Sequence, residues 1–412
     1  MHTEAFTALL TDEGRSLLDL LADHEIGEEL SLATRLRREH SPELVAAALT
    51  QSRLRQRGRA KFGADAARMY FTPHGLEQST RTSVAEHRAA RLVAAGGIDR
   101  AVDLCCGIGG DALALARAGI AVHAVDLDPL TCAVARANAD ALGLAHLLTV
   151  ECADVTEVEL GGYDAALIDP ARRTARGRTF DPRAYSPPFS FLTTLAARVP
   201  CGAAKVAPGI PHEIVPEGME AEWVSDRGDV KEAVLWWGRL ARGGLRATVL
   251  PAGAALASGP ARRAPVGPVR RYLYEPDGAV IRAHLVAEVG ELVDGNLVDE
   301  TIAYLASDKL VATAFASVYE ITDVLPFNLK RLKALLRERG VGNLTVKKRG
   351  SAVEPEEVRR RVGPTGPNAA TVLLTRVAGA PTMLIGQPVS PGQPTGPGLG
   401  GVLDRPGGPQ PM

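Results

Sequence analysis

From residue 99 onward, short apolar runs alternate with stretches of helical periodicity, and this alternation restricts the fold more than any other feature of the chain. The runs are DRAVDL, IAVHAV, LLTV, YDAALI and AAKVA, and helical patterns such as LTCAVARANADALG separate them. Strands that alternate with helices form a parallel sheet with helices on its faces. The series ends in AEWVSD and EAVLWWG, which predict an antiparallel hairpin. We therefore expect an α/β domain over residues 98–240.

The chain on either side of this domain has a different character. Residues 1–97 show leucines at helical spacing and a helix start at Ser41-Pro42-Glu43, so we expect an N-terminal helical region. Residues 241–386 begin with the linker ASGPARRAPVGP and continue with mixed strand and helix patterns, which predict an α+β module. Residues 387–412 are rich in proline and glycine, and we expect this tail to be disordered.

Composition excludes several classes of protein. The net charge of −1 gives no global attraction to nucleic acid or membrane, so any such partner must bind a local patch. No apolar run reaches the roughly 18 residues of a membrane span, and the N-terminus has no signal-peptide pattern. The five cysteines contain no C-x-x-C pair, so we expect no disulfide framework, no metal and a cytoplasmic location. Oligomeric state is not predicted.

A glycine loop follows the first predicted strand, in the stretch VDLCCGIGGDALALA. Gly107, Gly109 and Gly110 allow a ligand to approach the backbone at a helix N-terminus. The spacing Gly107-x-Gly109-x-x-Ala112 matches the dinucleotide fingerprint, although a tight turn without a ligand has the same pattern. The loop therefore indicates a nucleotide-like ligand without identifying it.

Three acids follow successive strands, and one of them separates the possible ligands. Asp126 lies 19 residues after Gly107, where a carboxylate accepts hydrogen bonds from ribose hydroxyls of NAD or S-adenosylmethionine alike. Asp103, directly before the glycines, would repel a pyrophosphate but suits a cationic amino-acid group beside a sulfonium. Asp154 is placed to accept from an adenine amine. Each acid alone could simply cap a helix, but three in succession favour a cofactor site.

With these motifs the chain resembles the class I S-adenosylmethionine-dependent methyltransferases over about residues 80–240. The resemblance rests on VDLCCGIGG, VHAVDLDP, CADV and AALIDPARR in the family's order. It implies a Rossmann-like domain with S-adenosyl-L-methionine as cofactor. Carried over, Asp103, Gly107 and Gly109 hold the methionine part, Asp126 the ribose and Asp154 the adenine amine. Two neighbours complete the expected cofactor-binding set: Cys105 and Leu127.

The whole chain is similar to bacterial methyltransferases whose C-terminal part is called THUMP-like. True THUMP modules bind structured RNA, so the resemblance implies an RNA substrate. Three basic clusters in the C-terminal module fit this expectation, although solvation alone explains each of them. The clusters are Lys330, Arg331, Lys333, Arg337 and Arg339, then 346–350, then 359–361.

The stretch AALIDPARRTARGR ends the fourth predicted strand where a substrate would meet the methyl donor. We expect Asp169, Pro170, Arg172 and Arg173 to be the catalytic residues. Asp169 would orient the nucleophile or take its proton, and the arginines would contact phosphate or stack on a base. A solvated basic loop is the alternative. The second proline and the aromatic residue of enzymes that methylate exocyclic amines are missing, which does not favour amine methylation of a stacked base.

Cys201 raises the possibility of a covalent nucleophile, as in pyrimidine C5 methylation, but no supporting His or Cys motif accompanies it. The sequence thus predicts an S-adenosylmethionine-dependent methyltransferase that acts on a base of rRNA or tRNA. A methyltransferase for a protein or small molecule is the alternative within this class. A nicotinamide-dependent oxidoreductase and a non-catalytic RNA-binding protein are alternatives of other classes. The RNA, the base and the atom are not predicted.

Overall fold

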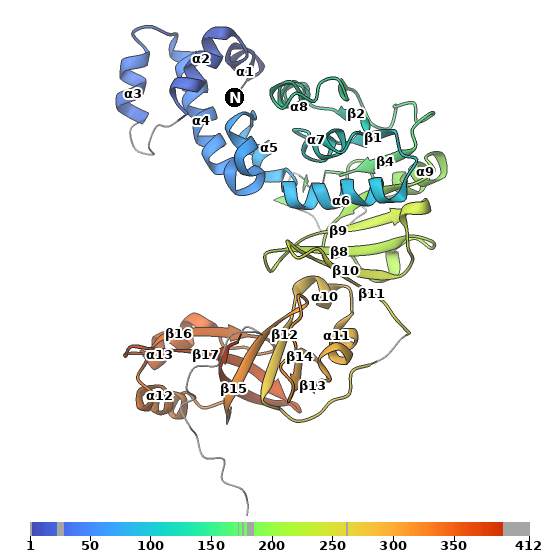
Figure 1. The fold of residues 1–412 in the computed structure, drawn as a ribbon. Helices are drawn as coiled ribbons and strands as arrows, with labels where there is room; N and C mark the ends of the chain where they lie inside the picture. The colour runs from blue at the N-terminus through green and yellow to red at the C-terminus, as the bar shows by residue number, and fades with distance from the viewer. Residues whose placement is uncertain are drawn as a thin grey trace, which may run out of the picture. The chain divides into compact units, whose positions relative to one another are not determined.

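The computed structural model describes residues 2–22, 29–171, 173–174, 177–178, 185–260 and 263–389. Contacts within the chain divide it into two compact units, Met1–Gly253 and Ala254–Met412, each drawn in Figure 1. The sequence predicted this boundary at residue 240, which comes before a further strand of the first unit. The expected tail begins inside the last strand, and its residues 390–412 lie outside the described part of the chain.

The first unit opens with helices, as the sequence predicts. Ser41 caps the longest of them, since its Oγ accepts a hydrogen bond from the Leu44 N–H at 3.2 Å. The helices are α1 (Thr3–Leu9), α2 (Asp12–Leu20), α3 (Glu29–Leu36), α4 (Pro42–Phe62), the 3₁₀ turn η1 (Gly63–Ala67), α5 (Pro73–Gln78) and α6 (Thr82–Ala95).

A sheet follows, and its strands within Met1–Gly253 have the order β10-β8-β9-β7-β4-β1-β2-β3. Strands β3, β2, β1, β4 and β7 are parallel, β9 runs antiparallel to β7, and β8 pairs antiparallel with β9. The strands are β1 (Arg100–Leu104), β2 (Ala121–Asp126), β3 (Leu148–Cys152), β4 (Ala165–Ile168), β7 (Gly202–Val206), β8 (Glu220–Asp226), β9 (Asp229–Trp237) and β10 (Leu245–Leu250), and β11 (Ala254–Ala257) belongs to the second unit. This is the Rossmann-like arrangement that the sequence predicts, and the β8–β9 hairpin is confirmed.

The sheet extends further than the sequence suggested, because β10 pairs in parallel with β8 beyond the hairpin. The connecting helices are α7 (Gly110–Arg117), α8 (Pro129–Ala141) and α9 (Ser190–Arg198), and a short antiparallel pair, β5 (Arg173–Thr174) with β6 (Gly177–Arg178), follows β4. The central strands read as almost continuous apolar runs because helices cover the sheet. In Figure 1, α6 and α7 lie beside these strands.

One hydrophobic core joins the N-terminal helices α1–α6, the helical front, to the sheet. It contains Phe6 and Phe71 from the front, Leu115 from α7 and Trp236 from β9, all fully buried or nearly so. Asn138 on α8 adds polar ties, since its Nδ2 donates to the carbonyls of Tyr70 and Ile108 at 3.2 and 3.0 Å. The N-terminal helices are therefore packed as part of the α/β domain.

The second unit contains a seven-stranded sheet with the order β13-β14-β12-β15-β18-β17-β16. Its strands are β12 (Tyr272–Pro276), β13 (Asn296–Asp299), β14 (Ile302–Ser307), β15 (Ala316–Pro326), β16 (Val341–Lys348), β17 (Asn368–Val377) and β18 (Ala380–Pro388), and its helices are α10 (Gly278–Arg282), α11 (Val286–Val293), α12 (Leu329–Glu338) and α13 (Pro355–Val362). Asn328 caps α12 as expected, since its Oδ1 accepts from the Arg331 N–H at 3.0 Å. In neither unit is any described helix long and apolar enough to cross a membrane.

Candidate active site

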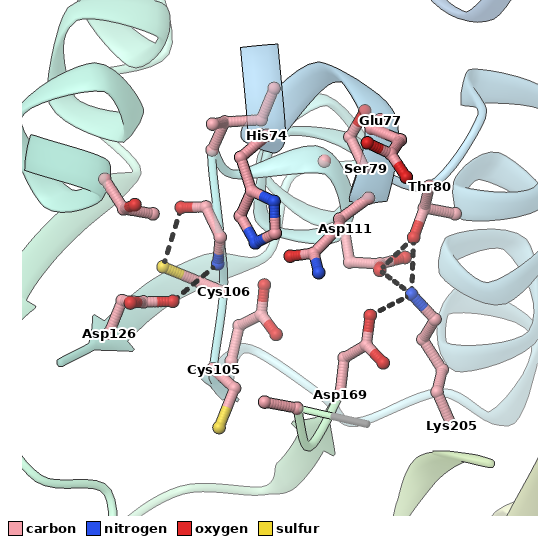
Figure 2. Close-up of a pocket in the computed structure, with 18 of the residues that line it drawn as sticks. His74, Glu77, Ser79, Thr80, Cys105, Cys106, Asp111, Asp126, Asp169 and Lys205 are labelled. Carbon is pink, nitrogen blue, oxygen red and sulfur yellow. Dashed lines mark hydrogen bonds and ion pairs between the residues drawn. The ribbon is translucent and has the colours of Figure 1, made fainter. Parts of the chain in front are cut away.

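A cavity of about 500 Å³ lies at the carboxyl ends of β1, β2 and β4, where parallel α/β sheets bind their ligands. Figure 2 shows its walls. The glycine loop and the ends of β2 and β4 form one part, and α5 with its connection to α6 forms another. The sheet thus brings Asp103, Asp126, Asp169 and Pro170 to one cavity, although they are far apart in the sequence.

The glycine loop needs a backbone conformation that L-residues rarely adopt. Gly107 and Gly109 have φ values of 58° and 91°, and Cys105 adopts the same left-handed region with a φ of 60°. The helical front approaches this loop closely, because a Cβ on Gly75 would come within 2.5 Å of the Ile108 side chain. Glycines therefore shape both the loop and the wall that faces it.

Asp126 is tied to this loop at the end of β2. Its Oδ2 accepts a hydrogen bond from the Gly107 N–H at 2.9 Å, and its Oδ1 accepts from the Asp128 N–H at 3.1 Å. Each carboxylate oxygen retains acceptor capacity for a ribose hydroxyl. The neighbouring Leu127 does not line the cavity, and its side chain is 69% exposed.

Asp103 has a buried oxygen without a partner. The residue is 3% exposed, and its Oδ2 accepts no hydrogen bond from any described residue. Burial, with a further contribution from the Asp111 charge, raises the pKa of Asp103 well above its usual range. An unpaired buried carboxylate is costly, and a cationic group in the cavity would relieve that cost. The ammonium of an amino-acid moiety such as that of S-adenosylmethionine fits this requirement.

Asp154 does not line the cavity and is exposed. Its Oδ1 accepts hydrogen bonds from the Thr156 backbone N–H and hydroxyl at 2.9 and 2.7 Å. These bonds lower the pKa of Asp154. The role of Asp154 toward adenine therefore stays a prediction.

Asp169 meets a cation that the sequence did not single out. Lys205 of β7 forms an ion pair with Asp169 Oδ2, donates to Thr80 Oγ1 at 2.6 Å and lies 3.7 Å from Asp111 Oδ2 (Figure 2). Burial alone would lower the pKa of Lys205, but Asp169, Asp111 and Glu232 outweigh burial and raise it. A buried ammonium therefore joins the end of β4 to the helical front.

A second buried cation supports this arrangement from behind. The guanidinium of Arg88 on α6 contacts both Asp111 and Glu232, and all three side chains are buried. Burial opposes the charge on Arg88, but Asp111 and Glu232 raise its pKa. Sequence reasoning missed Arg88, Asp111 and Lys205. The available signal was a charged residue at a core-facing position of a helix or strand, which requires a buried partner.

The described part of the chain does not include the side chains of the two arginines of the predicted catalytic set. Arg172 lies outside the described residues, and Arg173 is described only as backbone in β5. Their role stays a prediction.

The cysteines near the cavity do not resemble activated nucleophiles. Cys105 lines the cavity, and burial together with Asp126 raises the pKa of its thiol. Cys201 is buried directly before β7, donates to the Asp164 carbonyl at 3.3 Å and also has a pKa raised by burial. A catalytic thiolate needs the opposite shift. Among the described residues no cluster of three His, Cys, Asp or Glu could hold a metal.

The basic clusters of the second unit differ in how far they are neutralised. Arg339, Lys347 and Lys348 pair with the acids Asp323, Glu275 and Glu354. Several α12 cations are exposed and form no ion pair within the described part of the chain. They are Lys330, Arg331, Lys333 and Arg337.

Sequence models of three families match parts of the chain. They are RNA cap guanine-N2 methyltransferase at residues 98–190, THUMP domain-like at residues 316–388, and a domain of unknown function at residues 2–58. A 23S rRNA (uracil(1939)-C(5))-methyltransferase of Paraburkholderia xenovorans is 37% identical over 116 residues, which is 26% of this chain and 25% of that protein. A crystal structure assigned as a methyltransferase from Porphyromonas gingivalis W83 has a TM-score of 0.70 at 20% identity, covers 94% of this chain and 97% of its own, and supports the fold.

An uncharacterized S-adenosylmethionine-dependent methyltransferase of Mycobacterium tuberculosis is similar over most of the chain. It is 34% identical over 335 residues, which cover 79% of this chain and 90% of that protein. This match includes the glycine-loop domain whose cavity fits the cofactor. The chain therefore belongs to the S-adenosylmethionine-dependent methyltransferases, and S-adenosylmethionine is its cofactor.

Proposed function

We propose that this protein methylates a base of rRNA or tRNA. The observation that carries the proposal is the single cavity that presents the cofactor carboxylates and Asp169-Pro170 together. One family model that matches the chain is described as RNA cap guanine-N2 methyltransferase and another as THUMP domain-like, and exposed cations of α12 offer contacts for phosphates. These observations favour RNA over a protein or small-molecule substrate.

Within the cavity we assign the cofactor to the glycine-loop side. Asp103 would pair with the ammonium, the backbone around Gly107 and Gly109 would bind the methionine part, and Asp126 would accept from the ribose. Cys105 lines this side, whereas Leu127 and Asp154 lie nearby and would contact the adenosine. S-adenosylmethionine supplies an electrophilic methyl group when it is bound.

On the substrate side, Asp169 would act on the nucleophile. One of its oxygens is engaged by Lys205, and its side chain is 28% exposed toward the cavity. This carboxylate can orient a substrate N–H or O–H, or take its proton. Because Cys105 and Cys201 lack activated thiols, we propose direct in-line transfer without a covalent enzyme intermediate. As the cysteine pattern of the sequence suggests, we propose a cytoplasmic location.

A methyl-transfer assay tests this function. Purified protein is incubated with [methyl-³H]-S-adenosylmethionine and RNA from a strain that lacks the gene, and the RNA nucleosides are analysed by mass spectrometry. We expect one methylated nucleoside that Asp103→Asn protein does not produce. Protein and small-molecule fractions of the same strain are tested in parallel. Label in either of these fractions and none in RNA would contradict the RNA proposal.

A further inference from the structure

Three cations besides Lys205 line the cavity, and each comes from an element other than the glycine loop, β1 and β2. Lys61 comes from α4, Arg81 caps the N-terminus of α6, and Lys231 lies on β9. By contrast, the carboxylates of Asp103 and the glycine-loop partner Asp126 come from β1 and β2. Away from the glycine loop, these cations share the cavity wall with Glu77, Asp111 and Glu232. Asp111 and Glu232 already pair with Arg88.

Lys61 is held as a fixed charge. Its Nζ donates to the carbonyls of Leu76, Glu77 and Ser79 at 2.7, 2.7 and 2.9 Å, at the C-terminal end of α5. These three bonds use all three N–H groups of the ammonium. Lys61 therefore contributes charge to the cavity and braces its wall, but it has no donor left for a ligand.

The other two cations are only partly neutralised. Arg81 donates to the Ala60 carbonyl at 2.9 Å and lies 3.9 Å from Asp226, and Lys231 donates to the exposed Asp229 at 3.0 Å. A guanidinium has five N–H groups and an ammonium three, so both retain donors. Both Arg81 and Lys231 can therefore donate to a ligand in the cavity that they line.

Lys61 lies close enough to the other cations for their charges to act on its ammonium. Burial, together with the charges of Arg81, Lys205 and Lys231 and against a partial offset by Glu77, lowers the pKa of Lys61 to about 8. Clustered cations in a cleft indicate a site for a negatively charged ligand. A nucleotide whose base enters the cavity brings a phosphate on each side of its ribose, and Arg is suited to bind phosphate with two parallel hydrogen bonds.

We propose that Arg81 and Lys231, supported by the charge of Lys61, bind a backbone phosphate beside the target nucleotide. This inference rests on the proposed function, because it takes RNA as the substrate. The carboxylate of the cofactor is a second possible anion, and the experiment separates the two sources.

The first test uses inorganic phosphate as the probe, with S-adenosylhomocysteine saturating the cofactor side. Calorimetry compares wild type with the Arg81→Gln/Lys231→Gln variant, in which Lys61 still braces α5. The matched control is Arg57→Gln/Arg59→Gln, which removes two exposed cations of α4 that do not line the cavity. We expect phosphate affinity to fall about tenfold or more in the first variant and to stay unchanged in the control.

The same variants are then titrated with S-adenosylhomocysteine alone and with RNA at several salt concentrations. We expect unchanged cofactor affinity, which also shows that the fold is intact, together with a higher KM for RNA and a nearly constant kcat. The slope of log affinity against log salt should decrease by about 0.7, the value for one phosphate contact.

Equal phosphate binding by wild type and the Arg81→Gln/Lys231→Gln variant would overturn the proposal. A loss of cofactor affinity in this variant would assign the cations to the cofactor carboxylate and overturn it as well. If phosphate binding depends on Arg81 and Lys231 but no RNA is methylated, the anion site stands and the proposed RNA function fails. The outcomes of the two proposals are thus distinguishable.

Discussion

Lys205→Met tests whether the buried ammonium organises the active site. Methionine keeps the length of the side chain and removes its charge. Wild-type Lys205 contacts Asp169, Thr80 and Asp111, which lie directly after β4, in the α5–α6 connection and on α7. We therefore expect the substitution to lower both the stability of the first unit and the rate of methyl transfer.

The size of the effect follows from what each partner retains. Breaking a buried ion pair by removing one partner costs about 3–5 kcal/mol, because an uncompensated charge stays buried. Here Asp111 keeps its contacts with Arg88, and Thr80 still donates to Asp111 at 3.0 Å. Asp169 loses its partner, but its side chain is 28% exposed and water can solvate it. We expect a loss of about 1–3 kcal/mol in the free energy of unfolding.

Tryptophan fluorescence during urea unfolding measures this loss in the correct unit. All three tryptophans, Trp223, Trp236 and Trp237, belong to the first unit and are buried there. The matched control is Arg198→Met, which breaks the exposed pair with Glu159 in the same unit and should cost less than about 1 kcal/mol. If Lys205→Met were as stable as wild type and methylated at the normal rate, the ammonium would not organise the site.

Asp103→Asn should weaken S-adenosylmethionine binding by about 1.5–3 kcal/mol, since it removes a charged partner of the ammonium, and unchanged affinity in calorimetry would exclude that contact. Burial raises the pKa of Asp103, so its neutral form persists to higher pH than usual. The affinity of wild type for S-adenosylmethionine should therefore rise with pH, and binding should release a proton. Calorimetry in buffers of different ionisation enthalpy measures this release, which should be absent in Asp103→Asn. Asp169→Asn should reduce kcat about 10²–10⁴-fold with little change in RNA affinity if the carboxylate takes a proton, and steady-state kinetics with a normal kcat would refute this role. Arg172→Ala/Arg173→Ala should weaken RNA binding and leave cofactor affinity intact, and lysines there should restore binding only in part; unchanged RNA binding in a filter assay would identify a solvated loop.

The parts of the site that the sequence predicts share a local signal. Asp103, Asp126 and Asp169 each follow an apolar run, and the carboxyl ends of parallel strands meet at one edge of a sheet. The predicted strand positions alone were therefore sufficient to place these three carboxylates at the same edge of the sheet. Asp154 also follows a predicted strand, but its carboxylate accepts a hydrogen bond from Thr156 and does not line the cavity.

The residues that sequence reasoning missed depend on long-range contacts. Thr80 and Lys205 are 125 positions apart, and Arg88 reaches Glu232 across 144 positions. No local periodicity predicts such pairs, since each depends on how the helical front packs against the sheet. Strand β10 was missed for a related reason, because a short apolar run beside the Arg- and Gly-rich stretch 238–244 resembles the start of a linker.

Comparison of RNA nucleosides from cells with and without the gene tests the central claim most directly. Total rRNA and tRNA are digested to nucleosides and quantified by mass spectrometry, with complementation by wild type and by Asp103→Asn. The account predicts that one methylated nucleoside disappears on deletion and returns with wild type but not with the variant. Identical nucleoside profiles in all four strains would contradict the claim that this methyltransferase acts on rRNA or tRNA.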